Sequence, residues 1–201
     1  MNPQLSGVAV PDPTSSWIEA GFSVDSGRVR IGDFVVALDQ PTDRTAWGFE
    51  PPLVAAIDGI PECDVTPAPP ATHPNGAVGV DHVVVTSSDL GRTTAALEAV
   101  GIALRRSRSL GDREQRFFWA GTTIIEMVGP STAEGHTHAS IWGLALVSND
   151  LEASKERLGP LLSDPRPAVQ PGRSIAAIRT RELGISVTIA LMTPHEPSQL
   201  I

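Results

Sequence analysis

The chain has 201 residues, of which 41% are hydrophobic and 19% charged, and its formal net charge is -8. This acidic balance excludes the basic surface that nucleic acids and anionic lipids attract, so we expect no nucleic-acid partner. No apolar run reaches the roughly 18 to 20 residues of a membrane-spanning helix, and the first residues lack the basic and apolar segments of a signal peptide. Together with a single cysteine, Cys63, which cannot form an internal disulfide, these features predict a cytoplasmic protein without a membrane partner.

Residues 1–60 are predicted to form a partial, β-rich module. In residues 21–39, "GFSVDSGRVRIGDFVVALD", β-type residues are interrupted by Ser-Gly and Gly-Asp turns. This rhythm predicts three strands, preceded by a short helix that ends near Ala20. Residues 61–77 are predicted to be an extended connector, because their prolines lack backbone donors and have fixed φ angles.

Residues 78–131 have the pattern of a βαβββ module. "VDHVVVTS" predicts a strand, and "SDLGRTTAALEAVGI" predicts a helix with Ser88 or Asp89 as its N-cap. "ALRRSRSL", "REQRFFWAG" and "TTIIEMVG" predict three further strands separated by glycine-containing turns. Acidic residues interrupt the arginine-rich stretch from Arg105 to Arg116, and we expect it to form solvated strand faces and a turn.

Residues 132–201 repeat this order. They contain a strand, "SIWGLALVS", a helix, "NDLEASKERLGP", and later strands in "AVQPGRSIAAIRT" and "GISVTIALMT". The two units align when Asp89-Leu90 is matched with Asp150-Leu151, which places the two helix caps at equivalent positions. We therefore predict an internal duplication and an α+β fold, in which the partial N-terminal module precedes two tandem βαβββ modules.

Tandem βαβββ units, of which the first opens with "DHVVV" and closes with "IIEMVGP", resemble the vicinal oxygen chelate superfamily. That superfamily includes glyoxalase, bleomycin resistance protein and dioxygenase branches. The resemblance covers Val78 to Pro194 and implies that the paired modules curl into a glyoxalase-like half-open barrel. It also implies a divalent metal inside the barrel, held by residues from the first and last strands of each module.

The sequence contains only half of that ligand set. His82 and Glu126 match the two ligand positions of the first module, whereas the same positions of the second module hold Gly143 and Ala190, which have no ligating side chain. We therefore expect either one divalent metal (Zn, Ni, Fe or Mn) at His82 and Glu126, or none. Without metal, Glu126 can act as a general base that His82 orients, or the two side chains can form a purely structural pair.

The remaining histidines are candidates of a weaker kind. His136 and His138 alternate in "AEGHTHAS", so they can point to one face of a strand and supply a ligand, or they can belong to a polar surface loop. His73 in the connector and His195 in the tail are expected to be solvent-exposed.

Aromatic and apolar residues predict a small-molecule cavity in the barrel. We expect Phe117, Trp119, Trp142 and Met192 to line it, and Arg173 to reach its mouth and bind a ligand carboxylate. The alternatives are that the aromatic side chains belong to the core and that Arg173 is a turn residue in water.

Two classes of function follow from these residues. The first is an enzyme of the lyase, isomerase or epimerase kind, or a dioxygenase relative with a degenerate metal site, that acts on a small oxygenated metabolite with Glu126 and His82 as catalytic residues. The second is a metal-free protein that binds or sequesters a small molecule, as the bleomycin resistance branch does. A third alternative is a duplicated barrel with a structural role only. In each case we expect a homodimer, since an unpaired sheet edge invites association.

Overall fold

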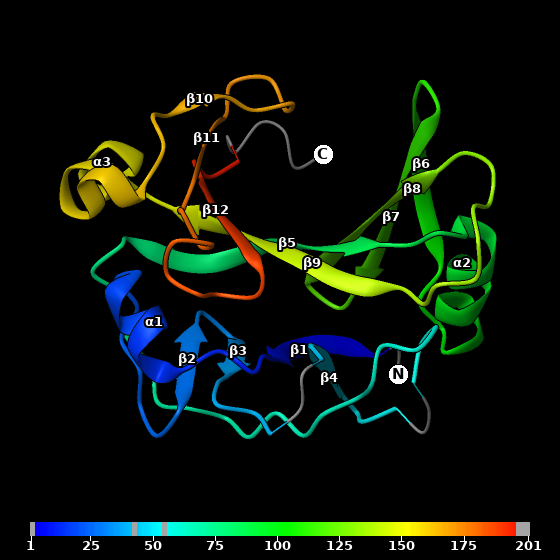
Figure 1. Ribbon diagram of the computed structural model, residues 1–201, viewed down its shortest axis with the longest axis horizontal. Helices are drawn as coiled ribbons and strands as arrows, with labels where there is room; N and C mark the ends of the chain where they lie inside the picture. Colours follow the sequence, from blue (N-terminus) through cyan, green and yellow to red (C-terminus); the bar gives the residue numbers. More distant parts are fainter. Residues whose placement is uncertain (1–2, 42–43, 54–55, 196–201) are drawn as a thin grey trace.

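The computed structural model describes residues 3–41, 44–53 and 56–195. Two β-sheets lie face to face, a four-stranded sheet from the N-terminal part of the chain and an eight-stranded sheet from the rest (Figure 1). None of the helices in these ranges is long and apolar enough to cross a membrane. The predicted α+β class is confirmed.

The first βαβββ module begins with β5 (Ala77–Thr86) and α2 (Leu90–Ala99) and continues with β6 (Leu104–Leu110), β7 (Arg113–Ala120) and β8 (Thr123–Pro130). The Asp89 carboxylate accepts a hydrogen bond from the Arg92 backbone N–H at 2.9 Å, so Asp89 is the N-cap of α2. β8 pairs in parallel with β5, and β7 and β6 follow it toward the sheet edge.

The second module has the same order of elements. It contains β9 (Ser140–Ser148), α3 (Leu151–Leu158), the 3₁₀ helix η1 (Gly159–Leu161), β10 (Arg166–Pro167), β11 (Ser174–Ala177) and β12 (Thr188–Met192). Asp150 caps α3 through a 2.9 Å hydrogen bond from the Ala153 N–H, as Asp89 caps α2. The sequence repeat is therefore a structural repeat, although its β10 has only two residues.

The two modules join through antiparallel pairing of β5 with β9, which places strands in the order β10-β11-β12-β9-β5-β8-β7-β6. His82 lies opposite Ile124 of β8, and Gly143 lies opposite Thr188 of β12. The same register relates Glu126 to Ala190, because each stands two residues further along its strand. This pairing confirms that Gly143 and Ala190 occupy the positions of His82 and Glu126 in the second module. The sheet curls, and its edge strands β6 and β10 remain apart, as in a half-open barrel (Figure 1).

The N-terminal module has a helix and four strands, and the prediction of three strands was incomplete. Its elements are β1 (Gln4–Ala9), α1 (Thr14–Glu19), β2 (Arg28–Ile31), β3 (Phe34–Ala37) and β4 (Ala46–Glu50). β1 pairs in parallel with β3 and antiparallel with β4. The segment before β2, which was expected to be a strand, forms only an isolated bridge between Asp25 and Arg28.

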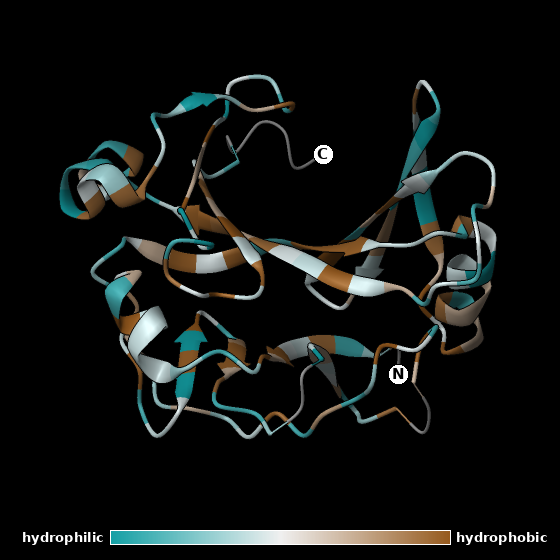
Figure 2. Cartoon of the chain, viewed as in Figure 1, coloured by the Kyte–Doolittle hydropathy of each residue, from teal (hydrophilic) through white to brown (hydrophobic). Residues whose placement is uncertain are grey.

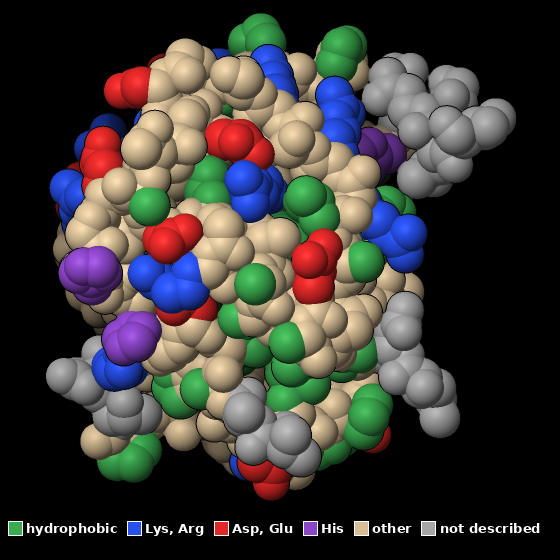
Figure 3. All heavy atoms as spheres, turned by 90° about the vertical axis from the view of Figure 1, so that its right-hand side faces the viewer, with side chains coloured by type: hydrophobic (Ala, Val, Ile, Leu, Met, Phe, Trp, Pro, Cys, Tyr) green, Lys and Arg blue, Asp and Glu red, His purple; other side chains and the backbone are tan. Residues whose placement is uncertain are grey.

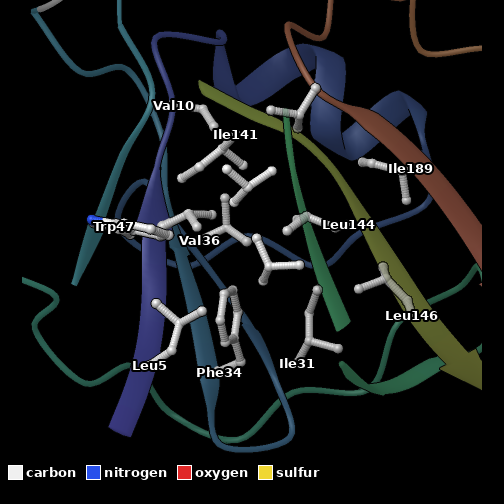
Figure 4. Close-up of a cluster of buried hydrophobic side chains, with 14 of the residues drawn as sticks. Leu5, Val10, Ile31, Phe34, Val36, Trp47, Ile141, Leu144, Leu146 and Ile189 are labelled. Atoms are coloured by element: carbon white, nitrogen blue, oxygen red, sulfur yellow. The ribbon is translucent and has the colours of Figure 1, made fainter. Parts of the chain in front are cut away.

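The hydrophobic core lies between the two sheets. Residues of the small sheet, among them Leu5, Val36 and Trp47, meet the inner face of the large sheet, where Leu146 and Ile189 are fully buried (Figure 4). Because this face of the large sheet is covered, only its opposite, concave face is available for a ligand. The small sheet thus acts as a support for the barrel.

The connector covers the outer face of the small sheet. It runs in extended form along the lower edge of the molecule in Figure 1, and Glu62 forms a parallel bridge with Trp47 of β4. Val65 lies over Gly7 and Gly48, where a Cβ atom on either glycine would collide with the Val65 side chain. The two glycines therefore allow the connector to pack directly on the sheet backbone.

Candidate functional site

The concave face of the eight-stranded sheet encloses a cavity of about 830 Å³. Side chains reach it from alternate positions of the central strands, such as His82, Val84 and Thr86 on β5 and Ile124, Glu126 and Val128 on β8. The hairpin of β6 and β7 forms one wall, and the segment of residues 166–171 forms another. Two walls and a sheet floor make a pocket of the size that small organic ligands occupy.

Two of the predicted site residues, His82 and Glu126, meet on the floor of this cavity. The His82 Nε2 atom lies 3.2 Å from Glu126 Oε2, and the two side chains are 12% and 14% exposed. Gln115 on β7 donates a 2.7 Å hydrogen bond from Nε2 to the other oxygen, Glu126 Oε1. Both carboxylate oxygens of Glu126 are therefore held, while the group still borders the cavity.

A β-bulge brings a second carboxylate to His82. Val80 lies opposite Leu146 and His82 opposite Ala145, so Asp81 is an extra residue in β5. Alternation along a regular strand would point Asp81 away from its neighbour, but here its Oδ2 atom lies 2.8 Å from His82 Nδ1. The bulge therefore places a carboxylate at each nitrogen of the imidazole ring.

Arg173 and His195 complete the surroundings of Asp81. Arg173 donates from Nη2 to Asp81 Oδ1 at 2.6 Å and from Nε to the Thr193 carbonyl at 2.8 Å, and its side chain is 1% exposed. His195 Nε2 lies 3.0 Å from Arg173 Nη1 and 3.3 Å from Asp81 Oδ1. Burial by itself would raise the pKa of Asp81, but the hydrogen bonds from His82 and Arg173 outweigh it and lower the pKa to about 2.

These contacts differ from two expectations. Arg173 lies behind the cavity and binds Asp81 of its own chain, and it does not line the cavity as a ligand-binding arginine or stand free in water. His195 is packed against Arg173 with its side chain 34% exposed, although the tail was expected to be in solvent. Neither contact is visible in the sequence, because Asp81 is separated from Arg173 by 92 positions.

The imidazole of His82 lies between two carboxylates. A neutral histidine carries hydrogen on one ring nitrogen only, so it can donate to Asp81 or to Glu126 but not to both. The Nδ1 atom faces Asp81, and the Nε2 atom faces Glu126 and the cavity.

The predicted aromatic residues line the cavity. Phe117, Trp119 and Trp142 all border it, and Met192 closes the floor at the β12 end. Trp119 and Trp142 are 53% and 52% exposed, so they do not belong to the core; the core aromatic residue of this region is the neighbouring Phe118. Trp142 is an extra residue of β9, opposite the step from Val84 to Val85. This bulge presents the indole to the cavity.

The residues present do not fit the four-ligand metal site of the resemblance. Ala190 has no donor atom, and a Cβ at Gly143 would lie 2.6 Å from the Thr188 carbonyl oxygen, so no larger side chain fits there without a shift of the strand. Within the described ranges, three or more His, Cys, Asp or Glu side chains nowhere converge in a metal-binding group. Neither His136 nor His138 borders the cavity, and His138 lies beside Asp58 at 3.6 Å. His82 and Glu126 are the two donors that face the cavity.

Five arginines border the cavity, and four of them belong to the stretch from Arg105 to Arg116 that was expected to form solvated strand faces. They come from β6, β7 and β10 and are Arg105, Arg106, Arg108, Arg113 and Arg166. Their side chains are exposed, as expected, but they are exposed to the cavity. The alternation of β7 contained the signal: its odd-numbered residues from 113 to 119 all face the cavity, whereas Arg116 points to α2 and bonds the Leu90 carbonyl.

The connector histidine was also placed wrongly. His73 is 7% exposed, accepts at Nδ1 from the Ser23 N–H and donates at Nε2 to the Arg30 carbonyl. Burial lowers its pKa, and the bond to the Arg30 carbonyl opposes this only in part. His73 thus fastens the connector to the N-terminal module and lies outside the cavity.

The sequence matches no family model and no curated protein. Among solved structures, a variant of 4-hydroxymandelate synthase from Streptomyces coelicolor is 14% identical, with 96% of this chain and 93% of that chain covered and a TM-score of 0.59. A halotolerant catechol dioxygenase is 12% identical over 95% and 86% of the two chains, also with a TM-score of 0.59. At this level of identity the likeness concerns the fold. Together with the paired βαβββ modules, it shows that the chain has the fold of the vicinal oxygen chelate superfamily.

Proposed function

We propose that this protein binds a small oxygenated molecule in the cavity and transfers a proton at one of its carbon atoms, as an isomerase, epimerase or lyase. The observation that carries the proposal is the chain of contacts from Gln115 through Glu126 and His82 to Asp81 at the cavity floor. A carboxylate that borders a ligand cavity and touches an imidazole can act as a general base with an adjacent proton store.

Glu126 is the base in this scheme. The carboxylate takes a proton from a carbon next to a carbonyl group of the bound molecule, so a C–H bond breaks, an O–H bond forms on Glu126, and the electron pair enters the enolate. Return of a proton to the other face of that carbon gives an epimer, and return to a neighbouring atom gives an isomer. Expulsion of a leaving group from the enolate gives the product of a lyase.

His82 supplies or stores the second proton. Because Nδ1 is bonded to Asp81 at 2.8 Å, the ring is fixed with Nε2 toward Glu126 and the cavity. Nε2–H can donate to the developing enolate oxygen or pass its proton to Glu126. Asp81 and Arg173 act as positioning residues, since they hold the ring and do not border the cavity.

Hydrogen exchange in D₂O tests this proposal. Phenylpyruvate, phenylacetaldehyde and dihydroxyacetone each carry exchangeable C–H groups next to a carbonyl, and loss of these signals is followed by ¹H NMR. We expect the wild type to accelerate exchange of at least one of them over buffer and Glu126→Gln to abolish the acceleration. Exchange that is as fast with Glu126→Gln as with the wild type would remove Glu126 from the role of base.

A second candidate function is a binding protein that uses the same cavity without chemistry. It is favoured by Glu126, whose two oxygens already have partners in Gln115 and His82. It is also favoured by Gly143 and Ala190, which leave the second module without counterparts of His82 and Glu126. If ligand binding is found but no member of the panel exchanges faster than in buffer, this second function is the better description.

A further inference from the structure

We infer that the molecule bound in this cavity is an aromatic organic anion, with its acidic group held by arginines on the two walls. The inference rests on the proposed function only in using the same cavity, and it names the class of ligand. It follows from the distribution of charge and aromatic side chains around the cavity.

Arginines stand on both walls of the cavity. On the hairpin wall, Arg106 lies opposite Phe117 and Arg108 lies opposite Gln115, so both share the cavity face with these two residues. Arg113 stands on the same face at the start of β7. Coloured by hydropathy, β6 is mainly hydrophilic, whereas the central strands β5 and β9 are more apolar (Figure 2).

The opposite wall has its own arginine, Arg166 on β10. It is followed by an apolar and proline-containing segment whose Val169 is 71% exposed. A positive charge on each wall means that an anion inside the cavity can be approached from two sides.

The cavity arginines have no acidic partners among the described residues. Other arginines of the chain are paired, such as Arg92 with Asp58 at 2.7 Å and Arg179 with Glu182 at 3.0 Å. On the face of the molecule that carries α2, acidic and basic side chains accordingly lie next to each other (Figure 3). The five cavity arginines, in contrast, take part in no ion pair of the described ranges.

This concentration of positive charge opposes the charge of the whole chain. The formal net charge is -8, yet among the residues that the structure describes the cavity is lined by five arginines and one carboxylate, that of Glu126. Unpaired like charges that face each other across a cavity destabilise the folded state unless an anion enters between them. A ligand with a carboxylate, sulfonate or phosphate group supplies that anion.

Aromatic side chains of the hairpin wall and of β9 supply the other half of the ligand description. Phe117, Trp119 and Trp142 offer flat apolar surface, and the two indoles are about half exposed. Aromatic rings gain from stacking on such surfaces beyond their burial alone. Since Glu126 repels a second carboxylate, the acidic group of the ligand belongs at the arginine walls, with the aromatic body over the indoles.

Two fluorescent probes that differ in one acidic group test this inference. 8-Anilinonaphthalene-1-sulfonate carries a sulfonate, and N-phenyl-1-naphthylamine is the same ring system without it. We expect the sulfonate to bind the wild type at least about tenfold more tightly than the neutral probe, because charge-assisted hydrogen bonds to arginine favour the anion. We expect this preference to shrink as salt concentration rises.

Arginine variants locate the effect. Arg106→Ala/Arg108→Ala should weaken binding of the sulfonate about tenfold and leave the neutral probe unchanged, whereas Arg106→Lys/Arg108→Lys should retain part of the preference. Arg181→Ala is the matched control, since Arg181 is exposed and lies outside the cavity. Trp142→Ala should weaken both probes, which places them on the cavity floor.

The outcomes separate this inference from the proposed function. Equal affinity for the two probes, or unchanged sulfonate binding in the arginine variants, overturns the assignment of an anionic ligand. Probe binding does not depend on proton transfer, so Glu126→Gln should still bind the sulfonate. Anion binding without hydrogen exchange would therefore contradict the proposed chemistry and support the ligand class. Hydrogen exchange without a preference for the anionic probe would support the proposed chemistry and contradict the ligand class.

Discussion

Replacing Arg173 by methionine should expose how strongly the site depends on the buried ion pair with Asp81. The methionine side chain fills a similar volume but cannot donate to Asp81 or to the Thr193 carbonyl. Asp81, of which 5% is exposed, would keep its charge with His82 as the main remaining partner. The variant therefore leaves a buried carboxylate partly uncompensated.

The expected loss of stability can be worked out from the pKa of Asp81. The difference between the ordinary pKa of 3.8 and the value of about 2 for Asp81 corresponds to about 2 kcal/mol, which His82 and Arg173 supply beyond the opposing effect of burial. Removal of one partner from a buried pair generally costs about 3 to 5 kcal/mol, because the other charge stays buried. We expect Arg173→Met to lower the free energy of unfolding by about 3 kcal/mol, or the melting temperature by roughly 6 to 12 °C.

Urea denaturation of four proteins measures this effect. The wild type, Arg173→Met, Asp81→Asn and the double variant form a cycle whose coupling free energy should be about 2 kcal/mol, since the double variant has no uncompensated charge. The control is Arg179→Met, whose pair with Glu182 is more than half exposed, with an expected cost of roughly 0.5 kcal/mol or less. A coupling near zero, or equal costs for the two arginine variants, would refute the reasoning.

The pH dependence has a definite sign. Because the pKa of Asp81 is lower in the folded chain than in the unfolded chain, its contribution to stability is complete above about pH 4 and is lost as the pH falls toward 2. In Arg173→Met the pKa of Asp81 rises, so acid unfolding should begin at a higher pH. An unchanged acid midpoint would contradict this assignment.

Three other features give simpler predictions. Gly48→Ala should lower the free energy of unfolding by about 2 kcal/mol, because its Cβ would overlap the Val65 side chain. Adding Val65→Ala should recover part of the loss. Gly79→Ala, which has open space around its Cβ, should leave the free energy of unfolding nearly unchanged. Burial lowers the pKa of His73 below 6.5, so thermal stability should fall as the pH drops below about 6.5 and should stay level in His73→Gln. Burial raises the pKa of the Cys63 thiol to about 11. At pH 8 its alkylation by iodoacetamide should therefore be about a hundred times slower than that of a thiol with a pKa of 9.0. Alkylation at the rate of a free thiol would show that the side chain is accessible.

The repeat could be predicted because it depends on local pattern, and the pairing of His82 with Glu126 followed from the superfamily resemblance of that repeat. Asp89 and Asp150 cap helices in the way their sequence context indicated. Gly143 stands seven residues before Asp150, as His82 stands seven before Asp89, and Ala190 stands four residues before Pro194, as Glu126 stands four before Pro130. The strand register agrees with both matches. Spacing from the helix cap and from the end of the unit is a property of the sequence, so this inference needs no tertiary information.

The surroundings of the pair could not be predicted, because they depend on irregular backbone and on distant contacts. Regular alternation places Asp81 and His82 on opposite faces of β5, and only a bulge in the pairing with β9 brings them together. Arg173 and His195 reach Asp81 from the far end of the chain. Arg113 is a different case, since the alternation of β7 was present in the sequence but was interpreted as a solvent-facing pattern.

The two halves of the barrel carry different side chains, because Gly143 and Ala190 of the second module replace His82 and Glu126 of the first. On the cavity floor, the first module contributes His82 and Glu126, whereas the second contributes Trp142, Ala190 and Met192. A substitution at Ala190 changes the volume available to a ligand without touching the Glu126 carboxylate or its partners. Duplication has in this way produced a barrel in which the shape of the cavity floor can diverge independently of the His82–Glu126 pair.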